Sequence, residues 1–274
     1  MSFWEPESHR LLRIPMDNLK EEHTMNKNIA FALVLLALAF SMLACGSIQI
    51  GDNGGSERIT GSGPVIEENR NVGDVTGVEL AMQGTLHISA GTTTSLRIEA
   101  QDNLMEYIET EVSGGTLLIR NTPGYDLQNT RPIQYFLTVE NLDNIEVSSS
   151  GDIEVGNLNS NSLSIRSNSS GDIKIDGLDG TSLDVKISSS GEVKISNGQI
   201  QEQNIDISSS GDYQAEDLAS STAKIDPTSS GSATVWVSDR LSGSLSSSGN
   251  IYYAGNPKVN VRLTSSGKAV QIND

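Results

Sequence analysis

The stretch Ser148-Ser149-Ser150-Gly151-Asp152 is the first of seven closely related copies in the second half of the chain. The glycines of successive copies are 20, 20, 20, 20, 18 and 18 residues apart, and two serines precede each one. A fixed period near twenty residues is typical of a solenoid, in which each repeat forms one turn of a coil. The copies are Ser149, Ser150, Gly151; Ser169, Ser170, Gly171; Ser189, Ser190, Gly191; Ser209, Ser210, Gly211; Ser229, Ser230, Gly231; Ser247, Ser248, Gly249; and Ser265, Ser266, Gly267.

Apolar residues recur at fixed distances from each glycine. Six positions before the glycine, Ile or Val occurs in six of the seven copies, and apolar residues such as Ile153 and Val155 alternate with polar ones after it. This alternation predicts two strands of about five residues in each turn. One such turn cannot bury its apolar face alone, whereas stacked turns bury a continuous core. We therefore predict an all-β, single-stranded parallel β-helix with coils of about 20 residues.

The Ser-Ser-Gly triplet is expected to form the corner of every coil. Glycine tolerates a positive φ there, and stacked serine hydroxyls can both donate and accept hydrogen bonds along the column. The competing interpretation is a row of nucleophiles, but no basic side chain recurs beside the serines to activate them. We therefore interpret the triplets as a structural corner ladder.

The position after the corner glycine is acidic in four consecutive copies: Asp152, Asp172, Glu192 and Asp212. Carboxylates stacked at strand spacing repel one another, so a bound cation such as Ca²⁺ would stabilise them. The glycine-rich nonapeptide typical of calcium-binding β-rolls is not found in the sequence, and we favour an acidic edge screened by solvent. We expect no catalytic residue, no metal site and no cofactor, with this acidic edge as the one candidate for Ca²⁺.

The N-terminal part predicts export and lipid attachment. Residues 1–24 are polar and charged, and we interpret them as an upstream extension or a mis-assigned start, with Met25 as the alternative to Met1. Residues 25–44 combine a short basic segment with an apolar run of signal-peptide length. This run ends just before Cys45, the only cysteine, which we predict to carry a lipid. Residues 45–64 are then the lipidated Cys45 and a flexible Gly/Ser-rich tether.

Residues 65–274 are predicted to form one β-helix domain, with regular repeats over 141–274. Residues 65–140 contain strand-like segments around Val78, Leu86, Leu96, Leu117 and Phe136 but no serine triplet. We expect them to form less regular coils that cap the N-terminal end of the stack. A cap is needed because an open end exposes unpaired backbone groups.

Charge and composition exclude several functions. The chain has a net charge of −17, which repels nucleic acids. With one cysteine no intramolecular disulfide can form, and the only histidine after residue 45 is His87, expected to be an ordinary outward strand residue. Two outward aromatic residues, Trp236 and Tyr252, leave a sugar-stacking strip as a minor alternative.

The order of the motifs resembles a known family. The segments Val75–Leu80, Gly84–Ile88, Leu96–Ala100 and Gly115–Ile119, followed by the Ser-Ser-Gly coils, are similar to bacterial lipoproteins that carry the "putative auto-transporter adhesin, head GIN domain". The resemblance covers about residues 72–270. It implies a β-helix at the cell envelope and brings no catalytic or binding residue with it.

The sequence therefore predicts a non-enzymatic, acidic envelope lipoprotein that presents a rigid β-helix as an adhesin or as a binding or structural module. Its expected partners are a membrane, through the lipid on Cys45, and a surface glycan or protein ligand. We expect it on the outer face of a membrane, with the identity of that membrane open. The alternatives are a β-helical carbohydrate-active enzyme and a periplasmic scaffold or stress accessory protein.

Overall fold

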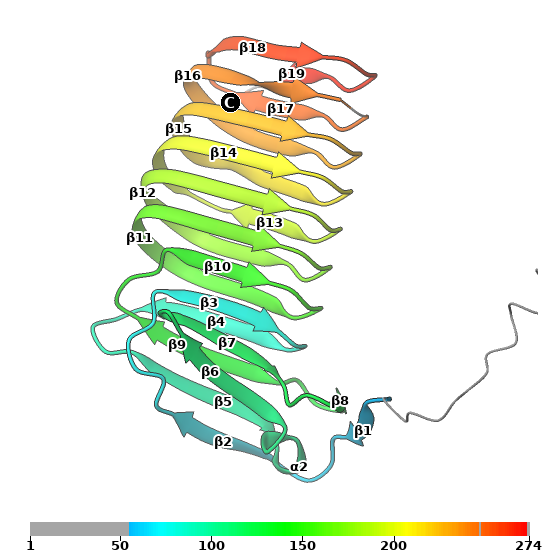
Figure 1. Ribbon diagram of the computed structural model, residues 1–274. Helices are drawn as coiled ribbons and strands as arrows, with labels where there is room; N and C mark the ends of the chain where they lie inside the picture. The colour runs from blue at the N-terminus through cyan, green and yellow to red at the C-terminus, as the bar shows by residue number, and fades with distance from the viewer. Residues whose placement is uncertain (1–54, 247, 273–274) are drawn as a thin grey trace, which may run out of the picture. The chain divides into compact units, whose positions relative to one another are not determined.

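The computed structural model describes residues 55–246 and 248–272. In this part of the chain the strands form a stack of coils, with the only helix, α2 (Asp102–Met105), near its N-terminal end (Figure 1). The strands of the N-terminal part are β1 (Glu57–Thr60), β2 (Val65–Arg70), β3 (Gly77–Ala81), β4 (Thr85–Ala90), β5 (Ser95–Gln101), β6 (Ile108–Ser113), β7 (Thr116–Asn121), β8 (Tyr125–Gln128) and β9 (Gln134–Val139). The stacked coils contain β10 (Asn144–Val147), β11 (Asp152–Ser167), β12 (Ile173–Ile187), β13 (Glu192–Ile195), β14 (Gly198–Ile207), β15 (Asp212–Pro227), β16 (Ala233–Leu245), β17 (Ile251–Ala254), β18 (Lys258–Leu263) and β19 (Ala269–Gln271).

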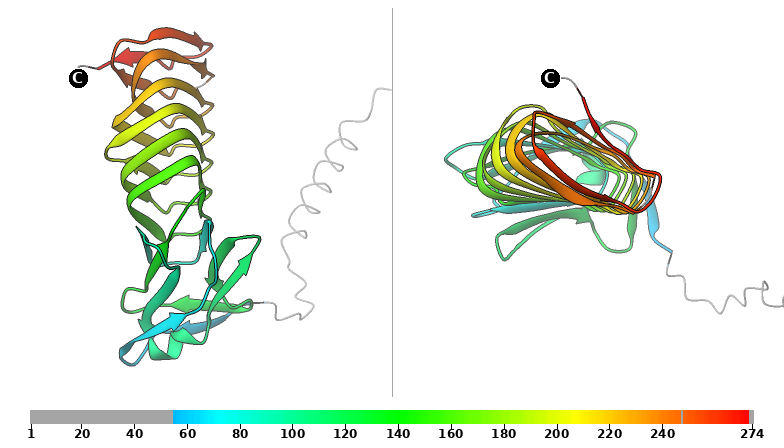
Figure 2. Two further views of the ribbon diagram at one scale, coloured as in Figure 1. Left: turned by 90° about the vertical axis from the view of Figure 1, so that its left-hand side faces the viewer. Right: turned by 90° about the horizontal axis from the view of Figure 1, so that it is seen from above.

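The coils lie in parallel register, as the period predicts. In β11 and β12, Ile153 pairs with Ile173 and Ile165 with Val185, an offset of 20 residues. The same offset joins β14 to β15, and it falls to 18 residues between β16 and β18. Seen from above, successive coils overlie one another (Figure 2). The parallel β-helix is confirmed.

The sequence predicts two short strands in each turn. In several coils these two strands are joined into one continuous strand. β11 and β15 each run for 16 residues because the bend opposite the serine corner stays extended and paired. Leu158 and Leu178 pair with each other in this bend and are buried, which keeps the backbone in strand geometry. Each coil therefore has one rounded bend and one sharp corner.

The core consists of columns of apolar side chains along the stack. The column six residues before the corner glycine is fully buried from Ile145 to Ile225, as the alternation predicts. Burying each such side chain stabilises the fold by about 1.5–3 kcal/mol. The last coil is covered on one side only, so Val259, Leu263 and Val270 remain 42%, 52% and 38% exposed.

One buried polar pair interrupts the apolar columns. Gln203 is completely buried in a column where Leu183 lies in the preceding coil, and Tyr213 occupies the column of Ile173 and Val193. The Tyr213 hydroxyl donates a 2.7 Å hydrogen bond to Oε1 of Gln203, whereas Nε2 of Gln203 has no partner among the described residues. Burial raises the pKa of the Tyr213 hydroxyl far above its ordinary value.

The N-terminal part continues the parallel stack and adds antiparallel strands to it. β3 and β4 lie beneath β10 and β11 in parallel register, and β7 and β9 lie beneath β3 and β4. Unlike the expected coils, the β2–β5–β9 and β6–β7 pairings are antiparallel. The β6–β7 hairpin turns at Gly114 and Gly115, both with positive φ, whereas β5 pairs with strands that are distant in the sequence.

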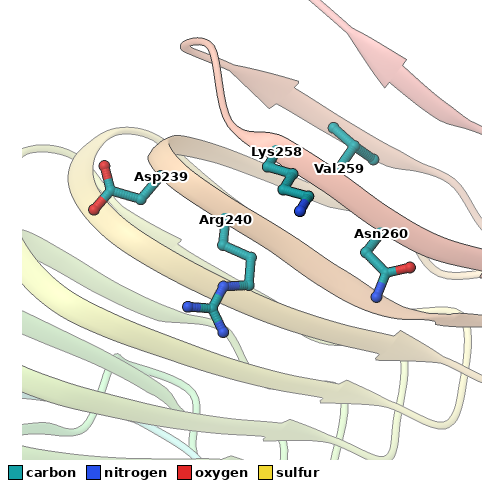
Figure 3. Close-up of a pocket in the computed structure, with 5 residues that line it drawn as sticks. All are labelled: Asp239, Arg240, Lys258, Val259 and Asn260. Atoms are coloured by element: carbon teal, nitrogen blue, oxygen red, sulfur yellow. The ribbon is translucent and has the colours of Figure 1, made fainter.

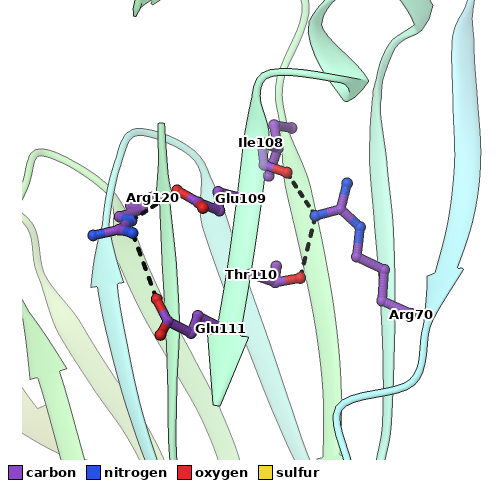
Figure 4. Close-up of polar contacts among 6 residues, drawn as sticks. All are labelled: Arg70, Ile108, Glu109, Thr110, Glu111 and Arg120. Carbon is purple, nitrogen blue, oxygen red and sulfur yellow. Dashed lines mark hydrogen bonds and ion pairs between the residues drawn. The ribbon is translucent and has the colours of Figure 1, made fainter. Parts of the chain in front are cut away.

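Arg70 binds the backbone at the base of this part. Its guanidinium donates hydrogen bonds to the carbonyl oxygen of Ile108 (2.6 Å) and to Oγ1 of Thr110 (3.2 Å) (Figure 4). It also donates to the carbonyl oxygen of Met105 at 3.3 Å. On the neighbouring strand, Arg120 pairs with Glu109 and Glu111. The Arg70 contacts satisfy backbone carbonyl groups at the point where the parallel coils stop, which is the role expected of a cap.

The ordered domain begins earlier than the predicted tether boundary. β1 pairs in parallel with β8, and the Gly61 N–H donates to the Gln128 carbonyl at 2.8 Å, so residues 57–64 are held against the domain. The predicted signal peptide, the predicted extension 1–24 and Cys45 lie outside the described residues. No helix in the part of the chain that the structure describes is long and apolar enough to cross a membrane.

The corner glycines are required for a different reason from the one the sequence suggested. None of the six from Gly151 to Gly249 has a positive φ, so that expectation is wrong. A Cβ on Gly171 would instead lie less than 3.0 Å from the Gly151 carbonyl oxygen, a separation that real Cβ atoms do not show. The coils approach here so closely that the Gly211 N–H donates to the Ser189 carbonyl at 2.9 Å.

Replacing Gly171 with alanine therefore forces two coils apart. We expect Gly171→Ala to lower the free energy of unfolding by about 1–3 kcal/mol, as overpacking does. The control is Gly156→Ala in β11, whose Cβ would meet nothing closer than the Ile88 carbonyl at 3.8 Å and should change stability by less than about 1 kcal/mol. Urea unfolding followed by circular dichroism measures both. Equal midpoints for the two variants would contradict close coil contact at the corner.

The buried Tyr213–Gln203 pair predicts a non-additive pair of substitutions. Tyr213→Phe leaves Oε1 of Gln203 buried without a donor and should cost about 1–3 kcal/mol. Adding Gln203→Leu restores the residue type found in the preceding coil, and we expect the double variant to regain most of the loss. A double-mutant cycle by urea unfolding tests this. Additive losses would show that the hydrogen bond is not the source of the effect.

Candidate functional site

The acidic edge lies beside the serine corner and has a structural function that the sequence interpretation missed. Oδ1 of Asp152 accepts the backbone N–H of Asp172 at 2.9 Å, and Oδ1 of Asp172 accepts that of Glu192 at 2.9 Å. Further along, Oδ1 of Asp212 accepts the N–H of Ser232 at 2.8 Å. Each aspartate thus satisfies a backbone donor in the following coil, where the chain leaves the corner.

Asn250 and Glu192 replace aspartate directly after the corner glycine, and their contacts show what the aspartate side chain does. Asn250 accepts the Lys268 N–H through Oδ1 at 3.1 Å, so the acceptor oxygen matters more than the charge. Glu192 has a longer side chain and accepts Nε2 of Gln214 at 2.8 Å instead. The presence of Asn250 in a column that begins with four acidic residues was the sequence signal for this function.

The carboxylates are brought into one row but do not form a metal cluster. Asp152 and Asp212 are exposed, and Asp172 and Glu192 are half-buried. Within the described residues, no group of three or more His, Cys, Asp or Glu side chains is arranged to hold a metal ion. What the row offers chemically is a line of acceptor oxygens at the spacing of parallel strands, about 4.8 Å.

The serines of the corner ladder face solvent. From Ser149 to Ser230, the first serine of each triplet is half-buried and the second is exposed; Ser247 lies outside the described residues. Stacking of hydroxyls is seen for Ser248 and Ser266, whose Oγ atoms are 3.4 Å apart. In the column before them, Nδ2 of Asn168 donates to Glu146 at 2.7 Å and Oγ of Ser188 donates to Oδ1 of Asn168 at 3.0 Å. The edge therefore presents a regular row of hydroxyl, amide and carboxylate groups.

His87 belongs to a polar row across the N-terminal sheet. Its Nε2 lies 3.2 Å from Oε1 of Gln134 and its Nδ1 lies 3.1 Å from Oε2 of Glu154. The ring stacks on Phe136, and the guanidinium of Arg97 lies 4.0 Å from the centre of the same phenyl ring. His87 is half-buried among partners on adjacent strands, and the corner serines lie on other coils.

The two outward aromatic residues do not form an exposed strip. Trp236 and Tyr252 are both half-buried, and Tyr253, whose position predicts an inward side chain, is half-buried as well. The bend of the β16 coil is shorter than its predecessors, so Trp236 pairs with Ala219 through a register shift. In the next coil Tyr252 pairs with Thr234 and Ala254 pairs with Trp236, so the two aromatic residues lie in different rows.

The aspartate row makes a stability prediction that separates hydrogen bonding from charge. Asp172→Ala leaves the Glu192 N–H without its acceptor and should lower the free energy of unfolding by about 0.5–1.5 kcal/mol. Asp172→Asn keeps the oxygen and removes one of the stacked charges, so we expect it to match or exceed the stability of the parent protein. Thermal and urea unfolding distinguish the two variants. An equal loss for asparagine and alanine would assign the effect to charge.

The coil architecture is shared with several solved structures. A putative adhesin from Bacteroides fragilis NCTC 9343 has a TM-score of 0.73 and 21% identity, and the match covers 78% of this chain and 100% of that one. A "putative lipid binding protein" and a putative adhesin, both from Parabacteroides distasonis ATCC 8503, have TM-scores of 0.64 and 0.62 and identities of 22% and 19%. Each match covers 79% of this chain and 100% of the solved one. At these identities the likeness shows the fold.

Sequence comparison gives the family directly. No curated protein matches the chain. Residues 74–257, which extend from the strands of the N-terminal part to the start of the last coil, match a single family description. The chain belongs to the family described as "Putative auto-transporter adhesin, head GIN domain".

Proposed function

We propose that this protein is an exported lipoprotein, anchored through Cys45, that presents its acidic β-helix as an adhesion or binding module without catalysis. The family description and the adhesin titles of the structural neighbours support a binding function. The apolar run that ends before Cys45 supports lipid attachment. The net charge of −17 opposes binding to nucleic acids and to anionic lipid headgroups.

The observation that carries the proposal is the unbroken register of the coils. From β10 to β15, outward positions of successive coils are Cα partners, so equivalent side chains form straight rows. Such rows repeat the same donors and acceptors at about 4.8 Å, which suits an extended or polymeric partner that makes many weak contacts. Catalysis requires one non-repeating group of residues in a cleft, and the outward rows are instead periodic.

The position of the anchor fits this arrangement. Cys45 precedes the first residue of β1, Glu57, by 12 positions, and β1 lies in the N-terminal part of the stack (Figure 1). A domain joined to a lipid near its N-terminal strands has its last coils, β16 to β19, at the opposite end of the stack. This leaves the sides and the far end of the stack available to a partner.

Protease treatment of intact cells tests the proposal. We expect a protease to cut before β1 and to release a folded fragment that begins near Glu57, because residues 57–64 are held by β8. Cys45→Ala should abolish incorporation of labelled fatty acid and prevent retention of the protein in the membrane fraction. A periplasmic marker protein serves as the control for envelope integrity. Full protection in intact cells, with cleavage only after permeabilisation, would refute surface presentation.

A further inference from the structure

Charge is distributed unevenly along the stack. Residues 55–218 contain 9 basic and 26 acidic residues, a net charge of −17, whereas residues 219–272 contain 5 basic and 2 acidic residues, a net charge of +3. The second range includes β16 to β19 and thus the C-terminal end of the solenoid. An otherwise acidic protein therefore has one basic end.

Four of these cations lie on the outward face of neighbouring strands. Arg240 of β16 is the Cα partner of Lys258 of β18, and Ser244 is the partner of Arg262. Lys224 lies on the adjacent strand β15, where its Nζ is 2.9 Å from Oδ2 of Asp226, a contact that raises the pKa of Lys224. We call this group of residues, Lys224, Arg240, Lys258 and Arg262, the basic end.

A depression of about 690 Å³ lies within the basic end. It is lined by Asp239, Arg240, Lys258, Val259 and Asn260. Arg240, Lys258 and Asn260 project from paired strands at this site, while Asp239 points away from the two cations (Figure 3). The Asp239 carboxylate accepts the Ser238 hydroxyl at 2.9 Å. Among the described residues, no carboxylate oxygen lies within 4.0 Å of the charged groups of Arg240 or Lys258.

The pairing of Arg240 with Lys258 differs from the other cation pairs of this protein, because no acidic residue is a Cα partner of either residue. Like charges directly opposite on paired strands destabilise a sheet. The other stacked cation pairs have a carboxylate in the same row of Cα partners. Glu154 is the partner of Lys174, which in turn pairs with Lys194. The pair of Arg166 and Lys186 has Glu146 on one side and Asp206 on the other. Arg240 has Thr222 as its other partner. An anion bound between Arg240 and Lys258 would supply the missing negative charge.

We propose that the basic end binds the oxyanion group, carboxylate or phosphate, of an acidic polysaccharide. The planar guanidinium of Arg240 can make paired hydrogen bonds to two oxygens of one group, and Lys258 adds a compact charge. Asn260 offers both a donor and an acceptor for sugar hydroxyls, and the exposed Val259 offers an apolar surface for the face of a sugar ring.

A polysaccharide fits better than the denser charge of a nucleic acid. Double-stranded DNA carries about one negative charge per 1.7 Å, and such a polymer would also meet the acidic coils beside the basic end. An acidic glycan has at least one sugar ring between successive charges, so it can place one oxyanion between the two cations and its sugar hydroxyls along the hydroxyl-rich coils. This inference rests on the proposed function, because it names the partner class of the presented domain.

Calorimetric titration of the full chain in detergent tests the proposal. The probes are oligogalacturonate, glucose 6-phosphate, a neutral galactose oligomer and a short single-stranded DNA. We expect a Kd in or below the low-millimolar range for at least one of the first two, weakening as salt increases, and no binding of the neutral sugar. The first two probes identify whether the preferred oxyanion is a carboxylate or a phosphate.

Matched variants locate the site. The exposed pair Arg240→Gln and Lys258→Gln should weaken binding at least about tenfold. The control pair, Lys174→Gln and Lys194→Gln, removes the same charge from another stacked pair and should change the Kd less than about twofold. Circular dichroism confirms that both double variants are folded. No binding of either anionic sugar at roughly 20 mM, equal losses in the two double variants, or binding of the DNA alone would overturn the proposal.

The two proposals fail separately. Surface presentation is decided by protease treatment of cells, and the ligand class is decided with the purified protein. A domain that is released from cells but does not bind acidic sugars would refute only the inference about the basic end. A domain that binds acidic sugars through Arg240 and Lys258 but is protected in intact cells would refute only surface presentation.

Discussion

The close approach of consecutive coils at the Ser-Ser-Gly corner is the constraint on which the rest of the structure depends. At this corner the backbone of one coil contacts the backbone of the next with no space for a Cβ, so glycine is required for steric reasons. The corner sets the register of all the residues between two glycines. The apolar columns, the aspartate row and the outward rows of polar side chains are in line because successive corners are in line.

The aspartates show how such a corner satisfies its backbone. A sharp corner removes N–H groups from the regular ladder, and buried or half-buried donors without acceptors destabilise a fold. A short side chain with an oxygen two bonds from Cβ reaches the following coil, which explains aspartate and asparagine at this position and the different contact made by Glu192. The structural need is for an acceptor oxygen, which the neutral Asn250 supplies as well as the aspartates do.

Much of the fold could be predicted from the sequence because the signal is periodic. Position in the repeat identified the inward columns and the parallel coil. The pairings of β2 with β5 and of β5 with β9 could not be predicted in the same way, because these strands lack the repeat and pair with strands distant in sequence, whereas β6 and β7 form a local hairpin. The Tyr213–Gln203 pair also escaped prediction, since a polar residue in an apolar column gains its partner only in three dimensions.

The basic end was hidden from the sequence by the net charge of the whole chain, which is dominated by acids before residue 219. The register places Lys258 and Arg262 on β18, a strand that pairs with β16 along one side. A strand with one unpaired side can pair with a strand of another chain. If a second copy met this end of the stack head to head, its Lys258 and Arg262 would lie close to Lys258 and Arg262 of the first copy. The repulsion between these cations opposes self-association through this end. The same charges therefore disfavour a dimer in which two copies meet through β18.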